Sequence, residues 1–255
     1  MPGGQYDSSK TRVAPVLDQL KARGGDWVRD LLTLPKFGSG ERPSSSVDVA
    51  FVEGHWGAKE RGLAPPVALL SWLIRNLSTP VGNTTVDENR ARLLQGDSAT
   101  IETALNLLRS AGTERRWHAF EGLTYPDATI ETPDALIVIE GKRTERGPTT
   151  HTTWMPGRHQ MWRHMDAAWE IRGRRAVFGF FLVDGLPPEP IEVPSVWELA
   201  SQATLAATGL DGSFPHRSDR ERQGIAQGFL GVATWQCVCA KFGLDFNTLP
   251  DTVDV

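Results

Sequence analysis

The chain has 255 residues, of which 40% are hydrophobic and 23% are charged, and its formal net charge is -4. These proportions are ordinary for a globular protein, so they exclude a disordered or fibrous chain. The negative net charge also excludes a protein that coats nucleic acid through its overall charge, so any polyanion would have to meet a local positive patch.

No part of the sequence predicts a membrane segment or a secretory signal. The longest apolar runs, residues 67–74 and 176–183, are well below the roughly 18 residues that a membrane helix needs. The N-terminus has no apolar run after a basic start. The two cysteines, Cys237 and Cys239, would point in different directions from one helix, which favours free thiols and a cytoplasmic location.

The first third of the chain predicts helices. Residues 1–12 are polar and contain glycine, so we expect a flexible tail. Residues 13–34 predict two short helices separated at Gly24 and Gly25, and further helices are expected over residues 65–77 and 86–96. We therefore assign residues 13–96 to an N-terminal helical region.

Residues 97–185 predict a core with the element order αβββαβ. Asp97 is suited to cap the first helix, and Gly112 is suited to end it. Short turns predict antiparallel neighbours for the first three strands, and a helical crossover predicts that the fourth strand runs parallel to its partner. The elements after the first helix are expected at residues 116–121, 127–132 and 135–143 (strands), 158–172 (helix) and 175–185 (strand).

The remaining residues, 186–255, are expected to form a C-terminal helical region packed on this core. Ser218 and Glu221 predict a capping box in front of a long helix that ends near Phe242. The predicted fold is therefore α/β with a mixed central sheet and helical additions at both ends.

A pair of Pro-Asp dipeptides raises the question of which aspartate works with Glu140. A hairpin turn centred between Pro133 and Asp134 pairs residues whose numbers sum to 267. Asp127 then lies opposite Glu140 on the same face of the sheet, whereas Asp134 lies at the tip, where Pro-Asp is ordinary turn chemistry.

Asp127, Glu140 and Lys142 together indicate a metal-dependent hydrolytic site. Alternation along the strand puts Glu140 and Lys142 on one face. Two opposed carboxylates near a core repel each other unless a cation lies between them, and hard oxygen ligands favour Mg²⁺ or Mn²⁺ over Zn²⁺. Lys142 would neutralise a developing oxyanion or orient an attacking water, which suits phosphodiester hydrolysis.

"YPD", ending at Asp127, is followed twelve residues later by "IEGK", which contains Glu140 and Lys142. On an αβββαβ core this pattern resembles the PD-(D/E)XK nuclease superfamily, which includes restriction endonucleases, repair nucleases and phage-defence effectors. The resemblance covers about residues 97–185. It implies a restriction-endonuclease-like fold, Asp127 and Glu140 as ligands of Mg²⁺ or Mn²⁺, and Lys142 as the catalytic lysine.

The resemblance also implies an upstream glutamate, for which two residues compete. A turn centred near Thr124 would place Glu121 opposite Asp127, so Glu121 is favoured as a further catalytic and metal-binding acid. Glu102 lies beside the apolar stripe of the preceding helix, where an exposed surface carboxylate is the simpler interpretation.

The helix expected at residues 158–172 provides the remaining candidates. Arg158 at its N-terminus would hold a phosphate, and the resemblance implies that Gln160 contacts the site. His164 stands where relatives often have a tyrosine. Residues 142–175 carry eight basic residues against three acidic ones, an excess of five positive charges that would flank the site.

The function expected from the sequence is a Mg²⁺-dependent DNA endonuclease of the restriction, repair or phage-defence type. Nucleic acid is the expected partner, and DNA is preferred to RNA by family habit alone. The main alternative is a nucleic-acid-binding or assembly module that keeps the fold without turnover, and a third is a structural hairpin with chance acids. Sequence specificity, action on ends or interiors, and a homodimer all stay open.

Overall fold

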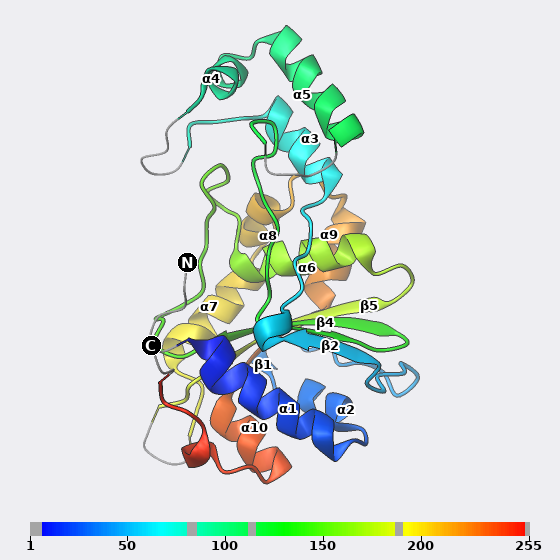
Figure 1. The fold of residues 1–255 in the computed structure, drawn as a ribbon, viewed down its shortest axis with the longest axis vertical. Helices are drawn as coiled ribbons and strands as arrows, with labels where there is room; N and C mark the ends of the chain where they lie inside the picture. The colour runs from blue at the N-terminus through cyan, green and yellow to red at the C-terminus, as the bar shows by residue number, and fades with distance from the viewer. Residues whose placement is uncertain (1–6, 81–85, 112–115, 187–190, 253–255) are drawn as a thin grey trace.

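A six-stranded mixed sheet forms the centre of the molecule, and the computed structural model describes residues 7–80, 86–111, 116–186 and 191–252 (Figure 1). The strands β2, β3 and β4 are antiparallel neighbours, β4, β5 and β6 are parallel neighbours, and β1 is antiparallel to β6. Across the sheet their order is β1 (Lys36–Phe37), β6 (Phe229–Thr234), β5 (Ala176–Val183), β4 (Ala135–Lys142), β3 (Ala128–Glu131) and β2 (Glu53–Trp56).

Helices cover both faces of this sheet, because β4, β5 and β6 are apolar on both sides. Ile137 and Ile139 of β4 face one helical layer, and Leu136 and Val138 face the other. The first layer contains α1 (Ala14–Arg23), α2 (Trp27–Leu32) and α10 (Trp235–Phe242). The second contains α6 (Gln160–Ile171), α7 (Ser195–Leu205), α8 (Ala207–Ser213) and α9 (Asp219–Gln227).

The helices α3 (Val67–Arg75), α4 (Glu88–Leu94) and α5 (Ser98–Ala111) form a helical subdomain with its own apolar core, beyond the second layer in Figure 1. Residues 60–66 and 121–126 join this subdomain to the sheet, and we name these two segments the neck. Leu63 and Thr124 form an antiparallel bridge inside the neck, with backbone hydrogen bonds of 2.8 and 2.9 Å.

The register of the β3–β4 hairpin is the predicted one. Ala128 pairs with Ile139 and Glu131 with Leu136, so each pair sums to 267. Asp134 lies in the turn, and its Oδ2 accepts a hydrogen bond of 2.9 Å from the backbone N–H of Asp48. The parallel pairing of β4 with β5 through the α6 crossover is also confirmed.

The strand predicted at residues 116–121 is wrong. That segment forms a bend and a turn, and the strand beside β3 is β2, from the region expected to be helical. Trp117 and Phe120 pack against the core of the helical subdomain, so their apolar character serves that core instead of the sheet.

The C-terminal region is not wholly helical either. The capping box of Ser218 and Glu221 is confirmed, but α9 ends at Gln227, and β6 then joins the sheet before α10 begins. Gly231 in β6 has a φ of +95°, and a Cβ there would lie 1.8 Å from the carbonyl oxygen of Lys36. A side chain could not fit at this position, so Gly231 allows β6 to approach β1 closely.

At the other end of the chain, the division into α1 and α2 is confirmed, and Gly24 and Gly25 between them both have positive φ. The flexible tail predicted for residues 1–12 is wrong for residues 7–12, because a π-helical turn, Ser9–Val13, packs on the sheet with Arg12 buried. Residues 1–6 and the predicted helix end at Gly112 lie outside the described residues. Among those described, no helix combines the length and apolar character needed to cross a membrane.

Candidate metal and catalytic site

The predicted trio meets at the carboxyl end of β4. Glu140 is 3% exposed, and the Nζ of Lys142 lies 2.7 Å from its Oε1. Asp127 is the residue before β3, and its Oδ2 accepts a hydrogen bond of 2.8 Å from the backbone N–H of Gly141. The hairpin therefore brings Asp127, Glu140 and Lys142 to one place.

Helix α6 contacts the same carboxylate with two side chains that lie one turn apart. Gln160 donates from Nε2 to Glu140 Oε1 at 2.6 Å. The Nε2 of His164 lies 3.0 Å from Glu140 Oε2, at ion-pair distance but out of line for a hydrogen bond. On its other side, His164 Nδ1 lies 2.8 Å from the hydroxyl of Thr124.

Glu60 is a third carboxylate of the site, and the sequence did not reveal it. It follows a 3₁₀ turn, Gly57–Lys59, and its charge acts on both Glu140 and Asp127. Residues 57–61 carry no periodic pattern, and 67 positions separate Glu60 from Asp127, so no local signal points to this residue. Glu60, Asp127, Glu140, Lys142, Gln160 and His164 together are named the Glu140 cluster.

The N-terminal segment lies against this cluster. Ser9 donates a hydrogen bond of 2.5 Å to Glu60 Oε1, and Ser8 donates one of 2.9 Å to the backbone oxygen of Gly141. Arg12 donates to the backbone oxygen of residue 250 at 2.6 Å, and Arg143 donates to that of residue 251 at 2.6 Å. Both ends of the described chain therefore meet beside the end of β4.

The Glu140 cluster contains more carboxyl groups than basic groups. Burial raises the pKa of Asp127 to about 8, and the negative charge of Glu140 adds to the effect. Burial also raises the pKa of Glu60, although the hydrogen bond from Ser9 opposes this. For Glu140 burial is opposed by His164 and Lys142, and the net result is a lowered pKa. A proton on Asp127 therefore takes the place of a missing positive charge.

Glu121 and Arg158 do not join the Glu140 cluster but pair with each other. Arg158 is fully buried, and its Nε and Nη2 bond the two carboxylate oxygens of Glu121 at 3.1 and 3.0 Å. Its Nη2 also lies 2.9 Å from Oδ2 of Asp166. His216 Nε2 lies 3.2 Å from the same oxygen, and Arg217 Nε lies 2.9 Å from Oδ1 of Asp166. We name these five residues the Asp166 network.

The predicted position of Glu121 opposite Asp127 is therefore wrong, because no strand forms at residues 116–121. Arg158 is enclosed by carboxylates and by the backbone oxygen of Ser213, 2.7 Å away, so it does not face a phosphate site in this structure. Glu102 is exposed on α5 in the helical subdomain.

The basic run is also largely neutralised inside the molecule. Arg143 pairs with Asp184, Arg163 with Glu121, and Arg175 with Glu131. The excess charge of residues 142–175 therefore serves mainly to hold the fold together.

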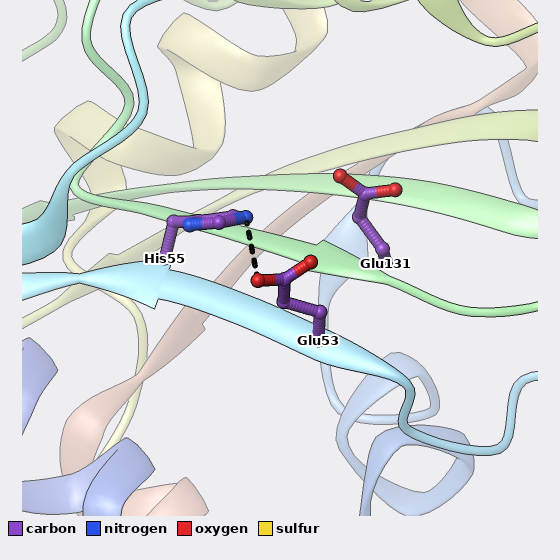
Figure 2. Close-up of side chains that lie close together, drawn as sticks. All are labelled: Glu53, His55 and Glu131. Carbon is purple, nitrogen blue, oxygen red and sulfur yellow. Dashed lines mark ion pairs between the residues drawn. The ribbon is translucent and has the colours of Figure 1, made fainter.

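A second group with metal-ligating side chains lies farther along the β2–β3 pair. Figure 2 shows Glu53 and His55 on β2 beside Glu131 on β3, and one ligand atom from each lies within 4.8 Å of the others. In the part of the chain that the structure describes, no other three His, Cys, Asp or Glu ligands come this close. Three ligand atoms of the Glu140 cluster therefore do not converge to that distance in the described part of the chain.

The Glu131 carboxylate, however, already has two cationic partners. It accepts from Arg61 and, at 2.6 Å, from Arg175. Burial opposes ionisation, but the two arginines outweigh it and lower the pKa of Glu131. A divalent cation would have to displace two guanidinium groups here, so this group fits a metal less well than the Glu140 cluster.

Protein-family models, curated proteins and solved structures were each compared with the chain, and none matched. The function therefore has to be inferred from the chemistry of the site.

Proposed function

We propose that the protein is a Mg²⁺- or Mn²⁺-dependent nuclease of the PD-(D/E)XK type, with DNA as the preferred substrate. The observation that carries the proposal is the meeting of Asp127, Glu140 and Lys142 at the end of one hairpin. A buried pair of carboxylates, one of which has its pKa raised to about 8, is stabilised by a cation that replaces the proton.

The fold supports the finer assignment to a restriction-endonuclease-like core. The antiparallel series β2–β3–β4, the α6 crossover and the parallel strand β5 give the three-plus-one strand arrangement that the motif requires. In this proposal the first strand of the core is β2 (Glu53–Trp56), so the core draws on residues well before position 97.

The donor set suits a hard divalent cation. Asp127 and Glu140 would hold it, and Glu60 takes the part of the upstream acid in place of Glu121. When bound, such a cation supplies positive charge for a water nucleophile and for the phosphate oxygens. None of the six described residues of the Glu140 cluster is a cysteine, and His164 is already engaged by Thr124, which argues against Zn²⁺.

Lys142 and Gln160 have separate tasks in this proposal. Burial lowers the pKa of Lys142, but Glu140 and Asp127 outweigh it and raise the pKa, so the side chain is an ammonium at neutral pH. A charged lysine stabilises the developing oxyanion and does not act as the base. The Oε1 of Gln160 is buried and has no hydrogen-bond partner among the described residues, so it is free to accept a hydrogen bond from a bound water.

Cleavage assays test the proposal directly. Plasmid and single-stranded DNA are incubated with the protein in Mg²⁺, in Mn²⁺ and in EDTA, and we expect metal-dependent cleavage that Lys142→Ala abolishes. Lys241→Ala is the matched control, because Lys241 lies on α10 against the opposite face of the sheet. Cleavage that survives EDTA or Lys142→Ala contradicts the proposal. DNA binding without cleavage in any metal supports the alternative instead, a nucleic-acid-binding or assembly module without turnover.

A further inference from the structure

We infer that Thr124 and His164 are positioning residues that fix the Glu140 carboxylate for metal binding. The inference rests on the proposed function, because it concerns the same metal site. It assigns roles to a threonine in the neck and to the histidine that stands in the place of a tyrosine on α6.

The two oxygens of Glu140 have unequal surroundings. Oε1 receives both Lys142 Nζ at 2.7 Å and Gln160 Nε2 at 2.6 Å. Oε2 faces His164 Nε2 at 3.0 Å and, among the described residues, has no hydrogen-bond partner in good geometry. The direction of Oε2, and with it the plane of the carboxylate, therefore depends on where the imidazole ring lies.

Thr124 determines how that ring presents its proton. An ionised carboxylate only accepts hydrogen bonds, so Nε2 of His164 must carry a proton to favour Glu140. The Thr124 hydroxyl, 2.8 Å from Nδ1, can donate to the neutral ring or accept from the charged ring, and in both cases Nε2 carries a proton toward Glu140. Both side chains are buried, so water does not compete for this contact. The arrangement has the form of an outer residue that fixes the tautomer and orientation of an inner one.

The position of the Thr124 hydroxyl is itself fixed by the neck. The backbone N–H and carbonyl of Thr124 both bond to Leu63, at 2.9 and 2.8 Å. The contact sequence therefore runs from the neck through Thr124 and His164 to Glu140. A change in the neck therefore alters the orientation of the Glu140 carboxylate without direct contact with it.

Mn²⁺ affinity, measured by calorimetry on the purified full chain at one pH, tests this inference. We expect Thr124→Val to weaken binding by about tenfold, since it keeps the shape of the side chain and removes the hydroxyl. Thr124→Ser keeps the hydroxyl and should bind within about twofold of the wild type. Thr129→Val is the matched control, because Thr129 is buried on β3 and its hydroxyl has no hydrogen-bond partner among the described residues.

A double-mutant cycle with His164→Gln removes any ambiguity from a folding defect. A glutamine amide can direct an N–H toward Glu140 without help from Thr124, so Thr124→Val should have no further effect in that background. If wild type binds Mn²⁺ and Thr124→Val binds equally well, the inference is overturned while the proposed function stands. If wild type binds no Mn²⁺, the proposed function itself fails. An effect of Thr124→Val that persists in the His164→Gln background also overturns the inference.

Discussion

Two buried polar groups contact helix α6, and they differ in how their charges are matched. In the Asp166 network, Arg158 and Arg217 face Glu121 and Asp166; burial would raise the pKa of Asp166, but the cations lower it to about 2. In the Glu140 cluster the acids outnumber the cations, and the pKa of Asp127 rises to about 8. The acids of the Asp166 network are matched by cations that hold the fold, whereas the unmatched acids of the Glu140 cluster are the ones for which we propose a metal.

At a fixed pH of 7, the largest effect of a single substitution is expected where the matching is complete. Arg158→Met removes a fully buried cation and leaves Glu121 and Asp166 with fewer positive partners. We expect the free energy of unfolding to fall by about 3–5 kcal/mol, the usual cost of breaking a buried ion pair on one side. Urea denaturation at pH 7 measures this. Arg174→Met, at an exposed position, should change it by less than about 0.5 kcal/mol. Equal stability of the two variants would contradict the structural role assigned to the Asp166 network.

The next effect concerns added metal. At a Mn²⁺ concentration of 100 times Kd, binding to the folded state should stabilise the wild type by about 2.7 kcal/mol, seen as a higher Tm. Asp127→Asn combined with Glu140→Gln should abolish the shift. Glu121→Gln should lower the starting Tm and keep the full shift, because Glu121 belongs to the Asp166 network. A shift lost in Glu121→Gln would restore the original assignment of the upstream acid.

The third effect is a pH dependence with a definite sign. The pKa of Asp127 in the folded protein, about 8, lies above its ordinary value of 3.8. The folded state therefore keeps a proton that the unfolded state has lost. The stability from this group is complete below about pH 4 and is lost as the pH rises to about 8, with a slope of up to about 1.4 kcal/mol per unit. Asp127→Asn should flatten the dependence measured by urea denaturation from pH 5 to 8. Identical slopes in both proteins would show that Asp127 is not the group concerned.

The smallest effect is expected at the group in Figure 2. Glu131→Gln weakens two partly exposed arginine pairs, so a loss of about 1 kcal/mol or less is expected. The Mn²⁺-induced rise in Tm should persist in this variant. Its disappearance would move the metal site from the Glu140 cluster to Glu53, His55 and Glu131.

The features that the sequence predicted correctly depend on local geometry. The turn at Pro133 and Asp134 fixes the register by counting, so it placed Asp127 beside Glu140. The α6 crossover likewise requires a parallel neighbour for β4. Both follow from short segments whose partners are close in the chain.

The features that were missed depend on distant partners. β2 pairs with β3 from more than 70 residues away in the sequence. Glu60 follows β2 in the chain, so the same long-range pairing brings it to the site. The run at residues 229–234 is short and apolar, and such a run cannot be assigned to helix or strand by periodicity alone. Arg158 has a suitable position along the chain, but its direction is set by Glu121 and Asp166, which no spacing rule connects to it.

The contacts of Arg12 and Arg143 with the backbone at residues 250 and 251 bear on how the protein is made. During translation β4 leaves the ribosome about a hundred residues before these partners do. A nascent chain therefore lacks the C-terminal contacts of Arg12 and Arg143, and the structure beside the Glu140 cluster is complete only after synthesis has passed residue 251.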